Sequence, residues 1–305
     1  MTARKALQTS ETVASRTTRI ITCANHKGGT GKTTTAVNVS AGLAFLKKKR
    51  VLLIDFDPQG NASMALGVDI ENLRYSVKDL LTGTMTDLHY LCWDKGDNLK
   101  ILPANATLKD VEPDLLRSVD GRLRLKNYLQ PILDQFDFVI IDTPPTLGVF
   151  TQAPLVASTE ILIPVDVGYF SLQGIRQLLE EIGSVRQVFN PTLEMKRILL
   201  TKFDSRTTLS AQVKEILRES FGEDTFNTVI NVNVDIVRAQ IERKSIFAYD
   251  LSSTGAQDYQ NVIEELLGNT VAVESGGNVI PFHRKKGKGP GGVKERTSRR
   301  TAKAD

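Results

Sequence analysis

A glycine- and lysine-rich segment near the N-terminus, residues 27–34 (KGGTGKTT), has the residue types of a phosphate-binding loop. It follows an apolar run of strand type, residues 19–24, and opens a stretch, residues 32–46, with apolar residues at helical spacing. Glycines let backbone N–H groups converge on phosphate oxygens, and the positive end of a helix adds to the attraction. The segment predicts a site in which Lys32 contacts the β- and γ-phosphates and the Thr33 hydroxyl binds Mg²⁺. The alternative, a plain glycine turn, would not explain why strand, loop and helix patterns agree.

Three carboxylates come at the ends of apolar runs. Asp55 and Asp57 lie at the end of VLLIDFD, and Asp142 ends FDFVIID. An acid at the carboxyl edge of a parallel strand faces the crevice where ligands bind. Four apolar residues followed by Asp form the Walker B pattern, whose acid holds Mg²⁺, usually through a water. The alternatives are solvated turn acids before Pro58 and, for Asp142, a cap on the next helix.

The elements that must position these groups alternate between strand and helix patterns. The expected strands are residues 19–24, 51–56, 99–102, 138–141, 161–165 and 198–201. The expected helices are residues 32–46, 121–133, 171–188, 209–221 and 255–267. The strand segments are continuous apolar runs, which is typical of a parallel sheet covered on both faces. We therefore expect an α/β fold with a doubly wound, mostly parallel sheet and helices on both faces.

Changes in composition divide the chain into three parts. Residues 1–18 lack periodicity and are expected to be a flexible N-terminal arm. Residues 19–273 are expected to form one nucleotide-binding domain, and residues 274–305, rich in Gly, Pro, Lys and Arg, a disordered basic tail. The last 23 residues contain five Lys, four Arg and two acids, a formal charge of +7, whereas the whole chain carries +4. The basic excess therefore lies in the tail rather than in the expected domain.

The remaining composition indicates a soluble cytoplasmic protein. Cys23 and Cys92 are the two cysteines of the chain, which argues against a disulfide framework and fits a reducing cytosol. The chain has no run of about 18 apolar residues that would span a membrane. Its first 18 residues also lack the apolar stretch of a signal peptide.

The phosphate loop departs from the general G-x-x-x-x-G-K-T pattern, because His26 stands where the first glycine is expected and Lys27 follows it. This K-G-G-x-G-K-T-T form is the deviant Walker A motif, and here the sequence resembles the ParA/MinD superfamily of ATPases. The resemblance implies ATP and Mg²⁺ as cofactors. It also implies that Lys27 reaches across a sandwich homodimer to the phosphates of the partner's ATP, where its charge stabilises the transition state.

Two further segments carry the resemblance. D-x-D-P-Q-G-N-A, beginning at Asp55, resembles switch I, which implies that Asp57 positions the attacking water. D-T-P-P-x-L-G, beginning at Asp142, resembles switch II, whose stiff turn could sense the γ-phosphate. The implied catalytic residues are Lys27, Lys32 and Asp57, and the implied Mg²⁺ residues are Thr33, Asp55 and Asp142. The implied ATP contacts are Lys27, Gly28, Gly29, Thr30, Gly31, Lys32, Thr33, Thr34 and Asn233.

Two segments bear on which base is bound. Thr201-Lys202-Phe203-Asp204 matches the guanine motif N/T-K-x-D, but the phosphate loop is of the deviant ATPase type, so we expect ATP. Asn233 matches the asparagine of a P-R-N segment that the family places beside adenine. The proline and arginine of that segment are absent, because Asn231 and Val232 stand there.

The chemistry of several relatives is missing from this sequence. It lacks the cluster-ligating cysteine after switch II, the C-x-x-C of iron–sulfur carriers, the Tyr-rich tail of tyrosine kinases and the amphipathic membrane helix of MinD. Eighteen residues before the first strand also cannot supply the helix-turn-helix domain of long plasmid ParA proteins. Residues 19–268 therefore resemble the short chromosomal ParA/Soj group.

The resemblance implies non-specific binding of double-stranded DNA, which requires Lys and Arg aimed at phosphates. Arg206 matches the arginine of the family's T-x-x-D-x-R-T segment, and the basic tail is a second candidate. The expected DNA-binding residues are Arg206, Lys214, Arg218, Arg238, Arg243 and Lys244. The alternatives are an ordinary solvated face and a merely solubilising terminus.

We therefore expect a partitioning ATPase that dimerises with ATP, binds nucleoid DNA in the cytoplasm and is released when a ParB-like partner stimulates hydrolysis. The same ATPase could instead position a protein assembly such as a carboxysome or a chemoreceptor cluster. A third alternative, from another class, is a metabolic ATP-dependent ligase or amidase, which would need a substrate pocket and no DNA.

Overall fold

The computed structural model describes residues 17–96, 98–168 and 171–269, which contain one seven-stranded sheet. Its strand order is β3-β4-β2-β5-β1-β6-β7, and every neighbouring pair is parallel except β3 and β4. The strands are β1 (Arg19–Cys23), β2 (Val51–Asp55), β3 (Trp93–Asp94), β4 (Leu99–Leu102), β5 (Phe138–Asp142), β6 (Glu160–Asp166) and β7 (Glu194–Thr201). The six expected strands are confirmed. Two residues form the additional edge strand β3, too few to show an apolar pattern.

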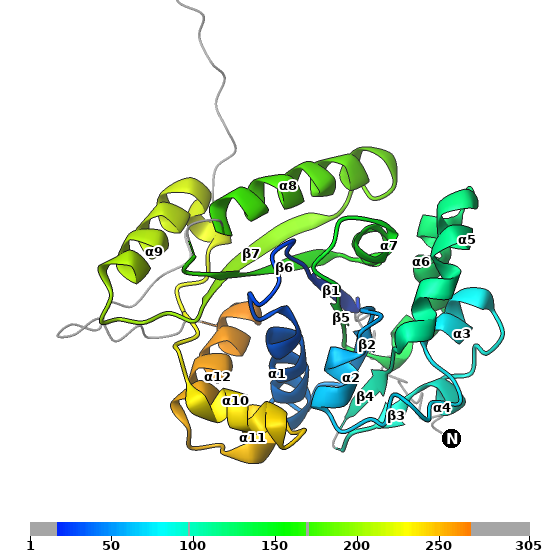
Figure 1. Ribbon diagram of the computed structural model, residues 1–305, viewed down its shortest axis with the longest axis horizontal. Helices are drawn as coiled ribbons and strands as arrows, with labels where there is room; N and C mark the ends of the chain where they lie inside the picture. The colour runs from blue at the N-terminus through cyan, green and yellow to red at the C-terminus, as the bar shows by residue number, and fades with distance from the viewer. Residues whose placement is uncertain (1–16, 97, 169–170, 270–305) are drawn as a thin grey trace, which may run out of the picture. The chain divides into compact units, whose positions relative to one another are not determined.

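Helices cover both faces of the sheet, with α1 and α12 on one side and α7 and α8 on the other (Figure 1). The α-helices are α1 (Lys32–Phe45), α2 (Asn61–Ala65), α3 (Val77–Thr82), α4 (Leu88–Leu91), α5 (Glu112–Arg117), α6 (Arg124–Leu129), α7 (Val149–Ala157), α8 (Ser171–Val188), α9 (Thr208–Phe221), α10 (Val234–Ile241), α11 (Ile246–Tyr249) and α12 (Thr254–Leu266). Short 3₁₀ helices are η1 (Ala106–Val111), η2 (Gly121–Leu123), η3 (Gln130–Gln135) and η4 (Gly222–Asp224). The expected doubly wound α/β fold is confirmed.

Because side chains alternate between the two faces of the sheet along each strand, the apolar residues of one strand contribute to a core on each face. On β2, Val51 and Leu53 pack in a core with α1 and α12, whereas Leu52 and Ile54 pack in a second core with α3, α6 and α7. Successive side chains of a strand point to opposite faces, so a strand with no polar position must be buried on both. Burial on both faces of the sheet therefore explains the continuous apolar runs in the sequence.

The buried helix α1 is fixed against its neighbours by a close approach at Gly42. A Cβ on Gly42 would lie 2.2 Å from Ile263 Cδ1 of α12 and 2.6 Å from Phe247 Cε2 of α11. A larger residue at this position would therefore require the Ile263 and Phe247 side chains to move. Because α1 begins directly after the phosphate loop, this packing also fixes the loop.

Two expectations need correction. The helix expected over residues 121–133 is broken into η2, α6 and η3, with Pro131 in the first turn of η3, where it supplies no backbone N–H. Thr18, assigned to the flexible arm, is buried, and its hydroxyl donates hydrogen bonds to the carbonyls of Leu133 and Phe136 at 2.6 and 2.8 Å. Residues 1–16 of the arm and the basic tail, residues 274–305, lie outside the described residues.

Among the described helices, none has both the length and the apolar character needed to cross a membrane.

Candidate functional site

The phosphate loop joins β1 to α1 and holds two glycines in left-handed backbone conformations. Gly29 has φ 77° and Gly31, directly before α1, has φ 87°. A side chain is disfavoured at both positions, which explains the glycines of the motif. The loop is fastened to two other strands, because Asn25 Nδ2 donates to the carbonyl of Pro164 at 2.7 Å and Thr201 Oγ1 to that of Thr30 at 2.8 Å.

Lys32 lies buried beneath this loop, and its ammonium donates to the backbone carbonyl of Lys27 at 3.1 Å. Burial lowers the pKa of Lys32, while the nearby Asp142 and Asp57 carboxylates act in the opposite direction. A desolvated ammonium beside a glycine-rich loop is suited to bind an anion, because the anion replaces the favourable interactions with water that burial removed.

Lys27 projects from the loop to the end of β6, where its ammonium lies 2.8 and 2.9 Å from the two carboxylate oxygens of Asp166. The two side chains are 32% and 16% exposed, so water reaches the pair. The lysine that the family resemblance directs toward a partner chain therefore makes an ion pair within its own chain.

Asp55 and Asp142 end the neighbouring strands β2 and β5 and are partners in the strand register, so their carboxylates face the same edge of the sheet. Both are fully buried. Burial raises the pKa of Asp142 well above its ordinary value, and the neighbouring Asp55 raises it further. Burial also raises the pKa of Asp55 to about 7, against hydrogen bonds from Ser63 and Asp57 that lower it.

Asp142 has the surroundings of a residue that holds a cation through water. Its Oδ2 accepts the Thr33 hydroxyl at 2.7 Å, whereas its Oδ1 is buried and has no hydrogen-bond partner among the described residues. An unpaired buried oxygen is costly, and a metal-bound water would satisfy it. No group of three or more His, Cys, Asp and Glu side chains in the described part of the chain is placed to hold a metal directly. Mg²⁺ needs no such group, because nucleotide phosphates and waters fill most of its positions.

The other two acids of the site are held by backbone and side-chain donors. Asp55 Oδ2 accepts the Ser63 backbone N–H at 2.8 Å and the Ser63 hydroxyl at 2.7 Å, which ties α2 to the end of β2. Asp57 is 5% exposed and accepts the Gln59 N–H at 2.9 Å. Burial raises the pKa of Asp57, and the Gln59 hydrogen bond and the charge of Lys32 oppose the rise. The roles expected for Asp55 and Asp57 stay predictions.

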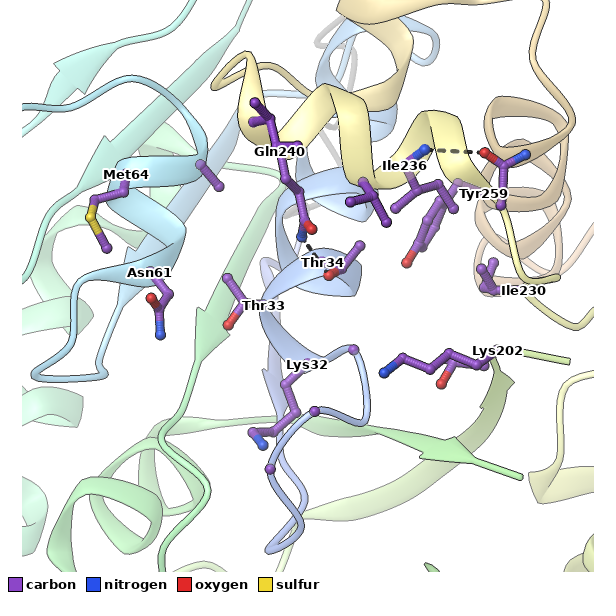
Figure 2. A pocket seen from close by; sticks show the side chains of 18 of the residues that line it. Lys32, Thr33, Thr34, Asn61, Met64, Lys202, Ile230, Ile236, Gln240 and Tyr259 are labelled. Carbon is purple, nitrogen blue, oxygen red and sulfur yellow. Dashed lines mark hydrogen bonds between the residues drawn. The ribbon is translucent and has the colours of Figure 1, made fainter. Parts of the chain in front are cut away.

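A pocket of about 710 Å³ opens beside the loop, a size that suits a small ligand such as a nucleotide (Figure 2). Its polar side is formed by the phosphate loop, and its apolar side includes Ile230, Ile236 and Tyr259. Gln240 extends from α10 toward the first turn of α1 and donates a hydrogen bond from Nε2 to the Thr34 hydroxyl at 2.7 Å. The pocket therefore combines an anion site with an apolar surface for a ring.

Asn233, expected beside adenine, lines the same pocket but caps a helix. Its Oδ1 accepts the backbone N–H groups of Asp235 and Ile236 at the start of α10, and its Nδ2 donates to the Thr254 hydroxyl at 2.6 Å. Nδ2 has a second N–H that these bonds do not use, and the adenine role of Asn233 stays a prediction.

The expected DNA-binding residues lie on two regions, α9 with the loop before it and α10 with the turn after it. Arg206 pairs with Asp204 at 2.8 Å, Arg238 with Asp235 at 3.1 Å and Lys244 with Glu242 at 2.9 Å.

The other three expected residues have different neighbours. Lys214 lies over the Phe203 ring, and burial lowers its pKa. Arg218 donates to Asn227 Oδ1 at 3.3 Å, and Arg243 lines the pocket beside the phosphate loop. Arg243 is therefore as well placed for the ligand of the pocket as for DNA.

Sequence reasoning assigned no role to three residues that the structure brings to the site, namely Asp166, Lys202 and Gln240. Asp166 directly follows an expected strand, a position that carries ligands in parallel sheets, so this signal was available. Lys202 lies in the segment discounted as a guanine motif. Gln240 lies 206 residues from Thr34 in sequence and carried no signal.

Comparison with known proteins identifies relatives of this chain. The family described as an AAA domain matches residues 18–195. The sporulation initiation inhibitor protein Soj of Bacillus subtilis is 38% identical over 251 residues, which are 82% of this chain and 99% of that protein. The chromosome partitioning protein ParA of Myxococcus xanthus is 37% identical over 249 residues, 82% of this chain and 88% of that protein.

Solved structures share the fold. Cobyrinic acid a,c-diamide synthase from Mycobacterium smegmatis, with bound ATP analogue and magnesium, has a TM-score of 0.72 and 32% identity, covering 87% of this chain and 100% of that chain. The ATP complex of a Cyanothece McdA variant has a TM-score of 0.75 at 22% identity and covers 84% and 99%. With the deviant phosphate loop and the acids at the strand ends, these similarities show that the chain belongs to the ParA/MinD superfamily of deviant Walker A ATPases, within its short ParA/Soj type.

Proposed function

We propose that this chain is an Mg²⁺-dependent ATPase that dimerises with ATP, binds nucleoid DNA and partitions chromosome or plasmid cargo in the cytoplasm. The observation that carries the proposal is the pairing of a complete phosphate site with a second lysine on the same loop. Lys32 lies inside the loop, whereas Lys27 projects away from it to Asp166. One lysine is thus placed for the chain's own nucleotide, and the other makes a water-accessible ion pair that it can exchange for another anionic partner.

The residues of the pocket divide the chemistry of hydrolysis among them. The loop N–H groups and Lys32 bind and orient the phosphates. Thr33 and Asp142 would hold Mg²⁺, which supplies charge neutralisation at the phosphate oxygens when it is bound. Asp57, close enough to Lys32 for their charges to interact, would orient the attacking water. A lysine from a partner chain would add positive charge where negative charge develops, which couples turnover to dimerisation.

The DNA and adaptor parts of the proposal rest on relatives. The relatives named chromosome partitioning proteins align with 82% of this chain. Among the expected DNA-binding residues that form ion pairs, Arg206 has the most exposed side chain, which is 85% accessible to solvent. A ParB-like adaptor that stimulates slow hydrolysis would release the DNA-bound dimer.

The experiment that tests the proposal measures the molar mass in solution by light scattering with and without ATP. The wild-type chain should double its mass with ATP and Mg²⁺, and Lys27→Ala should stay monomeric while still binding ATP. The control is Lys100→Ala, which removes a lysine that is also ion-paired, to Asp94 at 2.6 Å, but lies on β4. A Lys27→Ala protein that dimerises normally would refute the role of Lys27 across the dimer.

One observation favours a second candidate function, ATP-dependent amide formation. A solved structure at 32% identity is named as a cobyrinic acid diamide synthase. That activity requires a carboxylate acceptor and a nitrogen donor, whereas a partition ATPase responds to DNA. Phosphate release stimulated by double-stranded DNA and a ParB-like protein supports the first function. Release stimulated instead by cobyrinic acid with a nitrogen donor supports the second.

A further inference from the structure

Lys202 follows the last residue of β7 in a backbone conformation that is unusual for a residue with a side chain. Its φ is 52°, in the left-handed region that favours glycine. Residues held in this region persist where the surrounding structure imposes the conformation, and they concentrate at ligand sites. The side chain of Lys202 is exposed and lines the nucleotide pocket.

The residues on both sides of Lys202 are tied to different parts of that pocket. Before it, the Thr201 hydroxyl donates to the carbonyl of Thr30 in the phosphate loop at 2.8 Å. After it, Phe203 pairs with the segment that forms the apolar side, through a bond to the Ile230 carbonyl at 3.0 Å and one from Val232 N–H at 2.9 Å. Hydrogen bonds therefore hold the chain on both sides of Lys202, and they fix the position of its backbone between the phosphate loop and the apolar side of the pocket.

The Lys202 side chain extends from the end of β7 toward the phosphate loop (Figure 2). Its ammonium lies 4.0 Å from the position that a Cβ on Gly29 would occupy. Within the described residues, the ammonium has neither a carboxylate partner nor a hydrogen-bond acceptor, in contrast to those of Lys27 and Lys32. A cation that faces an anion-binding loop without a counter-charge adds to the positive potential of that loop.

We infer that Lys202 is a further nucleotide-binding residue, whose ammonium contacts the anionic sugar–phosphate part of the nucleotide from the β7 side. Ile230 and Val232 line the same pocket, so the methylene groups of Lys202 would cover the adjoining part of the ligand. The inference deepens the proposed function and depends on it, because it adds a residue to the same nucleotide site.

The test is a titration of ADP onto the full-length protein by calorimetry at low and at physiological salt. Lys202→Met keeps the length of the side chain and removes its charge. It should weaken ADP binding about 3- to 10-fold, as expected for one partly exposed charged hydrogen bond, with a smaller loss at high salt. Lys202→Arg, which keeps the charge, should restore most of the affinity.

Two variants separate binding from folding. Lys202→Gly relieves the left-handed backbone, so its melting temperature without nucleotide should not fall, while its ADP affinity falls at least as far as that of Lys202→Met. Lys48→Met is the matched control, because Lys48 has nearly the same φ, 53°, and lies over the Phe45 ring outside the pocket.

The outcomes separate this inference from the proposed function. ADP binding by Lys202→Met with wild-type affinity and salt dependence would overturn the assignment of Lys202. If the wild-type protein itself bound no ADP, the proposed ATPase and this inference would both fall. If wild-type binding were lost in Lys32→Ala but unchanged in Lys202→Met, only the inference about Lys202 would fall.

Discussion

The Lys27 ammonium lies between the two carboxylate oxygens of Asp166, at 2.8 and 2.9 Å, and so links the phosphate loop to the end of β6 within one chain. An ammonium in this position must leave its carboxylate before it can reach the phosphates of a second chain. The ion pair therefore competes with ATP-dependent dimerisation if Lys27 acts across the dimer.

Asp166→Asn should strengthen ATP-dependent dimerisation. The amide keeps the shape of the side chain but removes the charge that holds Lys27, and a partly exposed pair of this kind contributes up to about 1 kcal/mol. Both protomers must release Lys27 when they dimerise, so two ion pairs are broken, and the dimer dissociation constant with ATP should fall by up to about 30-fold in sedimentation experiments over a range of protein concentrations. Glu160→Gln serves as the control, since it weakens an ion pair with Arg19 at the opposite end of β6. Weaker dimerisation of Asp166→Asn would show that this carboxylate supports the dimer instead.

Asp57→Ala should leave ATP binding nearly unchanged and reduce turnover. The Asp57 carboxylate accepts the Gln59 N–H, and among the described residues it accepts no hydrogen bond from the phosphate loop. Loss of a group that orients water or accepts its proton costs about 10²- to 10⁴-fold in rate. Nucleotide titration and single-turnover phosphate release measure the two effects separately. Near-normal phosphate release would exclude Asp57 from the chemistry.

Asp142→Asn should stabilise the nucleotide-free protein at neutral pH and abolish the additional stabilisation by Mg²⁺. Burial raises the pKa of Asp142 above its usual 3.8, so the folded chain binds a proton more strongly than the unfolded chain does. Stability from this group is therefore complete below about pH 4 and is lost as the pH rises through the folded-state pKa. Asp55, with its pKa raised to about 7, contributes with the same sign.

The measurement is thermal unfolding between pH 5 and 8, with ATP alone and with ATP and Mg²⁺. The wild-type melting temperature without ligand should decline toward pH 8 from these two groups, and the decline should be smaller in Asp142→Asn. An equal gain from Mg²⁺ in the variant and the wild type would contradict the metal role of Asp142.

Gln240→Ala should weaken ATP binding about 2- to 10-fold. Its amide donates to the Thr34 hydroxyl at 2.7 Å, which connects α10 to the first turn of α1, and one neutral hydrogen bond contributes about 0.5–1.5 kcal/mol. Fluorescent-nucleotide titration measures the change. Gln257→Ala removes a comparable amide on α12, which bonds Asn261 at 3.0 Å, and should bind ATP like the wild type. Equal affinities of the two variants would show that the Gln240 bond has no part in binding.

Arg206→Glu should weaken binding to double-stranded DNA, most visibly at low salt. Each contact with a DNA phosphate releases a counterion, so removing one lowers both the affinity and its dependence on salt. Fluorescence anisotropy with labelled DNA from about 50 to 200 mM salt measures both. Arg117→Glu, an equal charge reversal at an exposed position of α5, should leave binding near the wild-type value. If both variants bind equally, DNA contacts lie on another surface or in the basic tail.

The elements of the fold were predictable where a local sequence pattern fits one kind of secondary structure only. The strands are buried on both faces, so their sequences are continuous apolar runs, and six of them were expected at nearly their observed positions. The division of residues 121–133 into η2, α6 and η3 was not predictable from the apolar spacing. That spacing continues across Pro131, although the backbone changes there from an α-helix to a 3₁₀ helix. Helix α10 was missed because its eight residues include exposed Val237 and Ile241, which hide the amphipathic pattern.

By itself, the sequence determined the nucleotide chemistry and the family, because glycine, lysine and threonine at fixed spacing in one loop need only local geometry to form a phosphate site. Tertiary structure decided which distant residues meet that loop. The strand order places β2 and β5 side by side, so Asp55 and Asp142 become register partners although they lie far apart in the chain. The same order turns the ends of β6 and β7 toward the loop, which gives Lys27 its partner Asp166 and places Lys202 in the pocket. Such pairings depend on long-range packing of the sheet, and no local spacing encodes them.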